Sequence, residues 1–229
     1  MKSLSFLIPC YNDETTIDAQ VTEAYSIGTK LAIPFEIIVI NDSSNDRTDH
    51  VLAELTKRIR ELRVITHTVN KGYGSTIKEL YYAAKKEWLF TIPGDYQVEA
   101  KELLKLLPRE RNADIILGWR TDRHDTGIRQ HQSRIYNWLI SLLFDTKTHD
   151  VNSVRLMKSS IMKSIILRGT SAFIDAELII KTKRLGFTVR EIPIGHRDRH
   201  DKAGTGGGGK LKVILPTIYE MLFYRLGIL

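Results

Sequence analysis

The sequence of 229 residues is poor in cysteine and contains no long apolar run. Its one cysteine, Cys10, excludes a disulfide within the chain and a zinc site built from several cysteines. No stretch reaches the roughly 18 apolar residues that a membrane-spanning helix needs. The opening MKSLSFLIP has an apolar run that is too short for a secretory signal peptide, and Pro9 ends it. These features favour a cytoplasmic protein.

Acidic residues are the minority among the charged ones. The chain has 34 Lys and Arg against 27 Asp and Glu, which gives a net charge of +7. Such a charge favours anionic partners: nucleotide phosphates, a lipid phosphate, an anionic membrane surface or nucleic acid. The basic residues are not interleaved with aromatic ones in a recognisable nucleic-acid-binding motif, so we expect no nucleic acid partner.

Strand and helix patterns alternate along the first half of the chain. This alternation predicts an α/β fold with a mostly parallel sheet and helices on both faces. Ligands of such sheets bind at the carboxyl ends of the strands, which here carry PCYND, NDSSND, NKGYG, PGDYQ and GWR. Each of these stretches is polar or glycine-rich, so a binding site is predicted along that edge. The expected strands are 4–9, 35–41, 63–68, 87–92 and 113–118, and the expected helices are 14–29, 46–62, 75–87 and 100–107.

The second half reads differently, but no interdomain linker or repeat separates it from the first. We therefore expect one domain over 1–229, divided into halves at 1–118 and 119–229. Helix patterns also occur at 134–144 and 176–186, and strand patterns at 151–157 and 188–194. The glycine-rich stretch 197–209 predicts a mobile loop, and the apolar C-terminus predicts a final helix that is packed or lies at a membrane interface.

The glycine-rich motifs do not match known nucleotide-binding loops. GTGGGGK is followed by Leu211, where a P-loop needs a hydroxyl for magnesium. NKGYG lacks the third glycine of a dinucleotide fingerprint, and the first strand–helix turn, PCYNDE, has no glycine at all. Gly72 and Gly74 are then either turn residues or allow a ligand to lie against the backbone.

Several polar residues at the predicted edge have two readings. Asp95, in FTIPGDYQVEA, either bonds its own turn or presents a carboxylate to a site. Asp42 either caps the next helix or accepts hydrogen bonds from a ligand. Arg120, Arg129 and Arg134 are either solvated surface cations or bind phosphate oxygens, which arginine does bidentately.

Taken in order, these stretches resemble family 2 glycosyltransferases. SFLIPCYNDE is similar to their S-x-V-I-P-x-Y-N-E, and EIIVINDSSNDRT to their E-I-I-V-V-D-D-G-S-x-D-x-T. NKGYGSTIKELYYAA is similar to N-x-G-x-G-x-A, and PGDYQ stands where the family has D-A-D-L-Q. GWR, DVNSVRLM and FIDAELIIKTKRLGFTVREIPI resemble the later motifs, and the branch most resembled is that of dolichyl- or polyprenyl-phosphate sugar synthases.

The resemblance implies a GT-A fold, a Rossmann-like and mostly parallel sheet with a C-terminal extension on the acceptor side. Residues 1–118 would bind a nucleotide-diphosphate sugar, a GDP- or UDP-sugar, and 119–229 the acceptor. Asp95 and Gln97 match the positions that hold Mg²⁺ or Mn²⁺, although Pro93 replaces the first acid of that motif. The implied donor-binding residues are Pro9, Tyr11, Asn12, Glu14, Asn41, Asp42, Lys71, Gly72, Gly94, Asp95, Arg197 and Arg199.

The implied reaction is an inverting transfer of the sugar, most naturally to a polyprenyl or dolichyl phosphate. Arg120, Ser133 and Arg134 would bind the acceptor phosphate, which is anionic and needs no strong general base. A hydroxyl acceptor would need a base, for which Asp175 and Glu177 are candidates. The missing acid at Pro93 motivates the alternative of a non-catalytic relative that binds sugar nucleotides. A lipid acceptor implies peripheral membrane attachment, with or without a membrane-protein partner.

Overall fold

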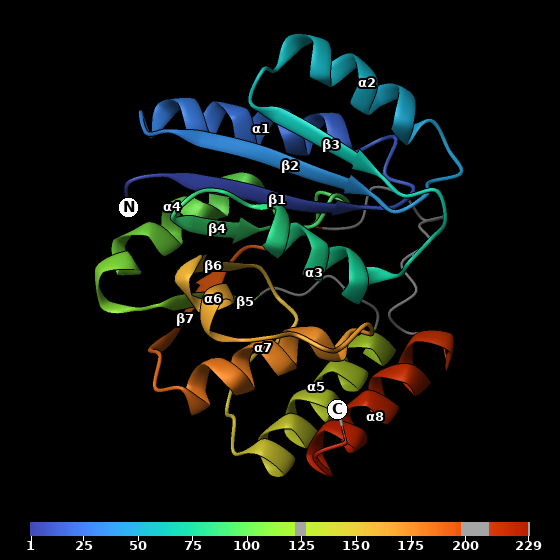
Figure 1. The fold of residues 1–229 in the computed structure, drawn as a ribbon, viewed down its shortest axis with the longest axis vertical. Coiled ribbons are helices and arrows are strands. Elements are labelled where there is room, and N and C mark those ends of the chain that lie inside the picture. The colour runs from blue at the N-terminus through green and yellow to red at the C-terminus, as the bar shows by residue number, and fades with distance from the viewer. Residues whose placement is uncertain (122–126, 198–210, 229) are drawn as a thin grey trace.

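The computed structural model describes residues 1–121, 127–197 and 211–228. Its centre is a seven-stranded sheet in the order β3-β2-β1-β4-β6-β5-β7 (Figure 1). Six strands run parallel to their neighbours where they pair with one another, and β6 is antiparallel to both β4 and β5. The strands are β1 Leu4–Cys10, β2 Phe35–Asn41, β3 Leu62–Thr66, β4 Trp88–Thr91, β5 Ile115–Arg120, β6 Arg155–Lys158 and β7 Val189–Ile194.

Helices cover both faces of this sheet, as the alternating pattern predicts. The main helices are α1 Ile17–Lys30, α2 Thr48–Arg58, α3 Tyr73–Ala83, α5 Gly127–Phe144, α7 Phe173–Arg184 and α8 Leu211–Arg225. Short turns α4 Leu103–Leu106 and α6 Ser160–Ser164 complete the set. None of the helices in the described part of the chain has the length and apolar character that a bilayer crossing requires.

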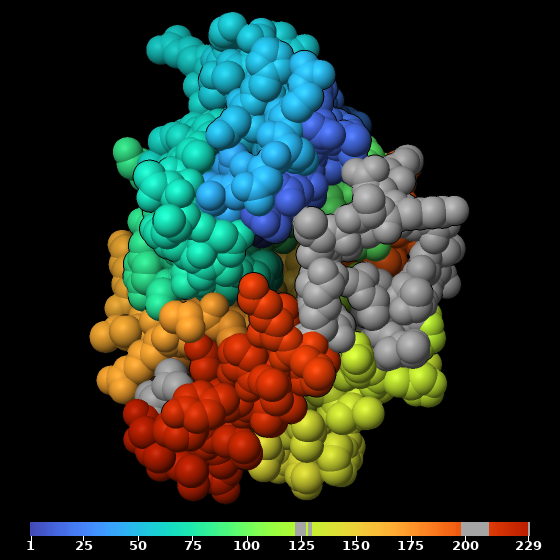
Figure 2. Space-filling model, turned by 90° about the vertical axis from the view of Figure 1, so that its right-hand side faces the viewer, coloured from blue at the N-terminus to red at the C-terminus, as the bar shows by residue number. Residues whose placement is uncertain are grey.

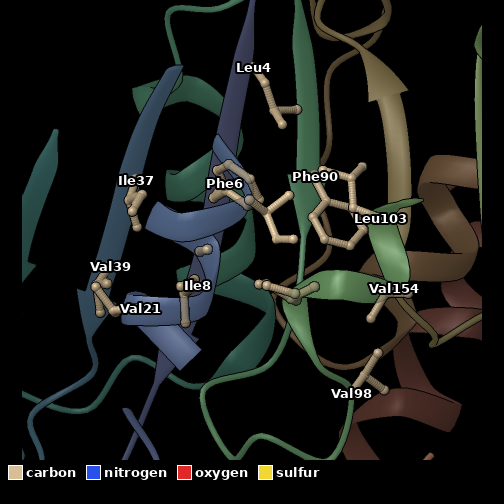
Figure 3. Close-up of a cluster of buried hydrophobic side chains, with 14 of the residues drawn as sticks. Leu4, Phe6, Ile8, Val21, Ile37, Val39, Phe90, Val98, Leu103 and Val154 are labelled. Atoms are coloured by element: carbon tan, nitrogen blue, oxygen red, sulfur yellow. The ribbon is translucent and has the colours of Figure 1, made fainter. Parts of the chain in front are cut away.

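Two separate apolar cores follow from the alternation of side chains along the strands. Phe6 and Ile8 of β1 point to one face, where they pack with residues of α1, α2 and α4 (Figure 3). Leu7 between them points to the other face and joins residues of α3, α5, α6, α7 and α8. All three side chains are fully buried, which explains why these strands read as continuous apolar runs.

Some predicted boundaries shift for local reasons. The helix expected over 100–107 is broken into a 3₁₀ turn, one turn of α4 and a second 3₁₀ segment that contains Pro108. The helix expected over 46–62 ends at Arg58, since Ile59 is already extended. Gly186 closes α7 with a φ of 80°, as expected of a helix-ending glycine.

Helices α5 and α8 lie side by side at one end of the molecule (Figures 1 and 2). Within α8, Met221 is buried in the second core, and Tyr224 packs on Phe144 and Phe173. Glu220 faces inward from the same helix toward the loop before α7. Its carboxylate accepts hydrogen bonds from the backbone N–H and hydroxyl groups of both Thr170 and Ser171. This carboxylate therefore ties α8 to the body of the domain.

The contacts of Glu220 make the attachment of α8 dependent on pH. Partial burial of the carboxylate opposes ionisation, but the hydrogen bonds from Ser171 and Thr170 outweigh it, so the pKa of Glu220 lies below its ordinary value. A lowered pKa means that the stabilisation is present above the unfolded-state pKa of about 4.3. It is lost as the pH falls through the lower, folded-state pKa.

We expect Glu220→Gln to lower the free energy of unfolding at pH 7 by about 1–3 kcal/mol, because hydrogen bonds to a charged acceptor are lost. Urea denaturation measured from pH 7 down to pH 3 checks this. The difference between wild type and variant should shrink once the pH falls below about 4.3. Glu54→Gln is the control, because Glu54 pairs only with Lys57 on the exposed side of α2 and should leave the unfolding midpoint nearly unchanged. A Glu220 effect of constant size at all pH values would contradict this role.

Candidate functional site

A cavity of about 890 Å³ opens at the carboxyl ends of β1, β2, β4 and β5. The start of α3 and the start of α7 form part of its wall, and α5 and α8 close it on the far side. Its position at this edge of the sheet agrees with the predicted site. The predicted site residues that line it are Pro9, Tyr11, Asp42, Gly72, Gly94, Asp95, Gln97, Arg120, Ser133 and Asp175.

The turns after β1 and β4 meet closely at one end of the cavity. The Asp13 carboxylate accepts a hydrogen bond from the Tyr11 backbone N–H and lies against Gly94. A Cβ atom at position 94 would stand only 2.7 Å from Asp13 Oδ2. A larger residue at position 94 would therefore displace the Asp13 carboxylate, which also lines the cavity.

Asp95 bonds its own turn and also lines the cavity. Its Oδ1 accepts a hydrogen bond from the Gln97 backbone N–H at 3.1 Å, which fixes the local turn, and the residue lines the cavity. Tyr96, between them, has a φ of 56°. The Arg197 guanidinium stacks over the Tyr96 ring and pairs with Glu99 at 2.8 Å, so the chain leaving β7 passes over this turn.

Asp42 holds the NKGYG stretch instead of capping the next helix in sequence. Its carboxylate accepts hydrogen bonds from the backbone N–H groups of Lys71 and Gly72, at 2.8 and 2.9 Å. His67 lies between Asp42 and Glu79, with ring nitrogens 2.7 and 3.0 Å from their carboxylates. Gly72 has a φ of 82°, which only glycine adopts without strain.

Other residues predicted to bind the donor support the loops around the cavity. Asn12 and Asn41 hydrogen-bond within the turn after β2, to the backbone N–H groups of Asn45 and Ser44 respectively. Glu14 accepts a hydrogen bond from the Arg47 backbone N–H. Neither these side chains nor the predicted residues Lys71, Arg134, Glu177 and Arg197 are among the described residues that line the cavity. Arg199 and most of the stretch 197–209 lie outside the described residues.

Arg120, the last residue of β5, is fixed by Asp150. Its Nε and one terminal nitrogen donate to the two oxygens of this carboxylate, at 2.7 and 3.0 Å. Asp150 is buried, so the bidentate pair fixes the direction of the guanidinium. Ser133 on α5 lines the cavity beside it, whereas Arg134 is exposed on the outer side of the same helix.

The two carboxylates suggested as bases are both engaged by other groups. Asp175 is fully buried, 2.6 Å from the Arg155 guanidinium, and accepts a hydrogen bond from the Tyr73 hydroxyl. Burial alone would lower the pKa of Arg155, but the Asp175 carboxylate raises it above its ordinary value. Glu177 accepts hydrogen bonds from the backbone N–H groups of Arg168 and Gly169, and from Lys181.

The residues at the Asp95 turn can be compared with the ligands that a divalent metal needs. The described residues contain no group of three His, Cys, Asp or Glu side chains that could hold a metal ion by themselves. Asp95 and Gln97 supply hard oxygen donors on one turn, as Mg²⁺ and Mn²⁺ prefer, and Asp13 lies beside Gly94. Among the described lining residues, five aspartates face only three cations, Arg120, Arg155 and Lys212. These residues fit a cation that completes its shell with diphosphate oxygens.

Sequence reasoning missed several lining residues, namely Asp13, Tyr73, Asp150, Arg155 and Lys212. Asp150 and Arg155 stand inside the quoted stretch DVNSVRLM, but nothing local shows that their partners are Arg120 and Asp175. Tyr73 belongs to NKGYG, in which only Gly72 and Gly74 were predicted to matter for a ligand. For Lys212 the only signal was its place next to the glycine-rich stretch.

Comparisons with known proteins give a consistent result. The family model described as Glycosyl transferase family 2 matches residues 5–167. A dodecaprenyl-phosphate galacturonate synthase of Rhizobium johnstonii is 27% identical over 97% of this chain. An undecaprenyl-phosphate 4-deoxy-4-formamido-L-arabinose transferase of Edwardsiella ictaluri is 26% identical over 92%. This chain spans 67% and 64% of the lengths of these two relatives.

A solved structure of glucosyl-3-phosphoglycerate synthase from Mycobacterium tuberculosis, in complex with Mn²⁺, UDP and glucosyl-3-phosphoglycerate, has a TM-score of 0.74 to this chain. The two are 17% identical, and the match covers 100% of this chain and 81% of that one. This likeness confirms the GT-A fold that the sequence motifs imply. Since the family model also covers more than half of the residues, this chain belongs to glycosyl transferase family 2.

Proposed function

We propose that this glycosyltransferase moves a sugar from a GDP- or UDP-sugar to the phosphate group of a polyprenyl phosphate. The names of both relatives described above include a polyprenyl phosphate, dodecaprenyl phosphate in one and undecaprenyl phosphate in the other. The observation that carries the proposal is the composition of the cavity lining: Asp13, Asp42 and Asp95 stand on the turns after β1, β2 and β4, and Arg120 stands at the end of β5, held by Asp150. The aspartate turns suit a metal-bound diphosphate, and the oriented arginine suits an anionic acceptor.

The described part of the cavity lining has three cations, Arg120, Arg155 and Lys212, and the first two are already paired with aspartates. Asp13, Asp42 and Asp95 would repel a diphosphate, so a divalent cation held by Asp95 and Gln97 would supply the missing positive charge. When bound, such a cation would stabilise the charge that develops on the leaving diphosphate. Pro9 and Tyr11 line the wall where the nucleoside would lie, and the turn after β4 would position the diphosphate.

The state of the candidate bases favours a phosphate acceptor over a hydroxyl. Asp175 is neutralised by Arg155, and Glu177 is occupied by backbone N–H groups and Lys181. A phosphate monoester needs no such base, because its oxygen is already anionic near neutral pH. In the proposed step this oxygen forms a bond to the anomeric carbon. The bond from that carbon to the diphosphate breaks on the opposite face, and its electron pair leaves with the nucleotide.

A lipid acceptor requires contact with a membrane, and helices α5 and α8 provide a suitable surface. Ile135, Trp138 and Leu142 on α5 are 58–63% exposed and lie on one side of the helix. On α8, Leu215 and Leu222 are exposed as well. Helix α5 has no acidic residue, and Glu220, the only acid of α8, faces inward. We propose that this face lies on an anionic lipid surface.

The metal role of Asp95 predicts cation-dependent donor binding. We expect UDP or GDP to bind at least about tenfold more tightly with Mn²⁺ than with EDTA, because a cation removes the repulsion from the lining aspartates. Asp95→Asn should lose most of this gain, measured by isothermal titration calorimetry. Asp18→Asn is the control, since Asp18 pairs with Arg58 on the exposed side of α1. If the nucleotide binds equally well with and without metal, the arginines and not a cation would bind its diphosphate. If it binds tightly but no sugar is transferred, the chain would be a non-catalytic relative.

If Arg120 binds the acceptor, its removal should slow sugar transfer much more than it weakens donor binding. Arg120→Ala should reduce the rate of sugar transfer to a polyprenyl phosphate by about a hundredfold, as the loss of one oriented charged donor does in other enzymes. The dissociation constant of the donor should change by less than about twofold, because Arg120 stands on β5, which β6 separates from β4 and the Asp95 turn. Arg58→Ala, which breaks an exposed ion pair, is the control. Equal losses in transfer and donor binding would argue against an acceptor site.

The proposed membrane face predicts a selective effect on vesicle binding. Trp138→Glu places a charge in the exposed apolar stripe of α5 and should weaken cosedimentation with vesicles rich in anionic phosphatidylglycerol. Tyr82→Glu is a matched control, because Tyr82 is 54% exposed on α3, away from this surface. Transfer to a water-soluble, short-chain polyprenyl phosphate should remain unchanged in both variants. Unaltered vesicle binding of Trp138→Glu would place the membrane contact elsewhere.

A further inference from the structure

The cavity also contains polar groups that have no role in the reaction proposed above. Three hydroxyl groups there, Thr91 Oγ1, Tyr136 OH and Ser153 Oγ, have no hydrogen-bond partner among the described residues. All three residues line the cavity, and Thr91 and Ser153 are only 4% and 5% exposed. A buried hydroxyl without a partner is costly, so these groups point to a ligand that supplies the missing hydrogen bonds.

These hydroxyls gather around one buried ion pair. Thr91 on β4 lies directly opposite Arg155 on β6 in the sheet register. Arg155 donates to the Ser153 backbone carbonyl and pairs with Asp175. Tyr136 reaches the group from α5, and the Asp175 carboxylate is among the charges that raise the pKa of its phenol, after burial itself. The centre of the cavity is therefore a cluster of neutral hydroxyl groups over a pair whose charges cancel.

The electrostatic character of this centre sets limits on its ligand. The Arg155 guanidinium is 99% buried and already bound to Asp175 and Ser153, so it is not available to a ligand carboxylate. Among the described residues that line the cavity, both guanidinium groups are paired with aspartates, so a ligand carboxylate would have to compete with Asp150 for Arg120 or with Asp175 for Arg155. Sugar hydroxyls both donate and accept hydrogen bonds, as the three orphan hydroxyls require.

We propose that Thr91, Tyr136 and Ser153 form the subsite for the transferred sugar, and that this subsite selects a neutral, hydroxyl-rich sugar over one that carries a carboxylate. The inference rests on the proposed function, because the sugar must lie between the diphosphate at Asp95 and the acceptor at Arg120. The inference goes beyond the proposed function because it names the class of sugar. It also separates this chain from the relative that is named for galacturonate transfer.

Matched donor pairs test the selection directly on the wild-type protein. UDP-glucose and UDP-glucuronate differ only at C6, and so do GDP-mannose and GDP-mannuronate. Each is titrated calorimetrically in the presence of Mn²⁺, with UDP and GDP as references. For the nucleotide that binds, we expect the neutral conjugate to bind at least about tenfold more tightly than the uronate. A uronate that binds as tightly as its neutral counterpart, or more tightly, overturns the inference.

Two variants test the named hydroxyls. Ser153→Ala and Tyr136→Phe should each weaken the neutral conjugate by about three- to tenfold, because each removes one hydrogen bond to the sugar. Binding of bare UDP or GDP should not change, since neither hydroxyl faces the nucleotide in this assignment. Tyr219→Phe, at a site 57% exposed on α8, is the control for loss of a tyrosine hydroxyl. Equal weakening of conjugate and bare nucleotide would show a structural role and overturn the assignment.

Failure of the proposed function has a different signature. If neither UDP nor GDP binds with Mn²⁺, the donor site itself is wrong, and the sugar subsite is overturned with it. If a nucleotide binds but its sugar adds no affinity and no discrimination, the donor site stands and only the subsite fails. The reference titrations with bare nucleotides therefore distinguish the two outcomes in one series.

Discussion

The buried ion pair between Arg155 and Asp175 is the interaction on which the cavity depends. β6 is the one antiparallel strand of the sheet, and it carries Arg155 into the interior between β4 and β5. Asp175 comes from α7, and its second oxygen binds the Tyr73 hydroxyl of α3. One charge pair thus joins three elements that are distant in sequence. Because an uncompensated buried charge costs several kcal/mol, these elements are held in a single arrangement.

Carboxylates elsewhere in the chain fix the loops around that centre. Asp42 binds the backbone before α3, Asp95 binds its own turn, and Glu177 and Glu220 bind successive N–H groups of residues 168–171. These bonds hold the backbone before α3, after β4 and before α7 in place before any ligand arrives. Preorganised donors and acceptors contribute most to catalysis when they do not have to move during the reaction.

The sequence predicts the parts of this fold that have a local cause. The β-branched run 35–41 is a buried strand, and Gly186 ends its helix. Both can be predicted because burial selects apolar residues along a strand and a positive φ selects glycine. A cap on the following helix was one of two possibilities for Asp42, but its carboxylate binds residues 71 and 72, beyond another strand. Glu177, a candidate base from the sequence, instead supports residues 168 and 169. Such pairings depend on tertiary contacts, which no local pattern records.

The distribution of charge shows why net charge alone misleads about the site. The chain carries +7, which suggests a basic site for phosphates, yet aspartates outnumber cations among the described residues that line the cavity. The positive charge lies largely outside the cavity, and α5 and α8 turn no acidic side chain outward. An acidic donor pocket calls for a cation to admit a diphosphate, whereas an acid-free apolar face suits an anionic bilayer. Lys212, in the first turn of α8, lines the cavity and so connects the two regions; under the proposed function it would attract an entering lipid phosphate.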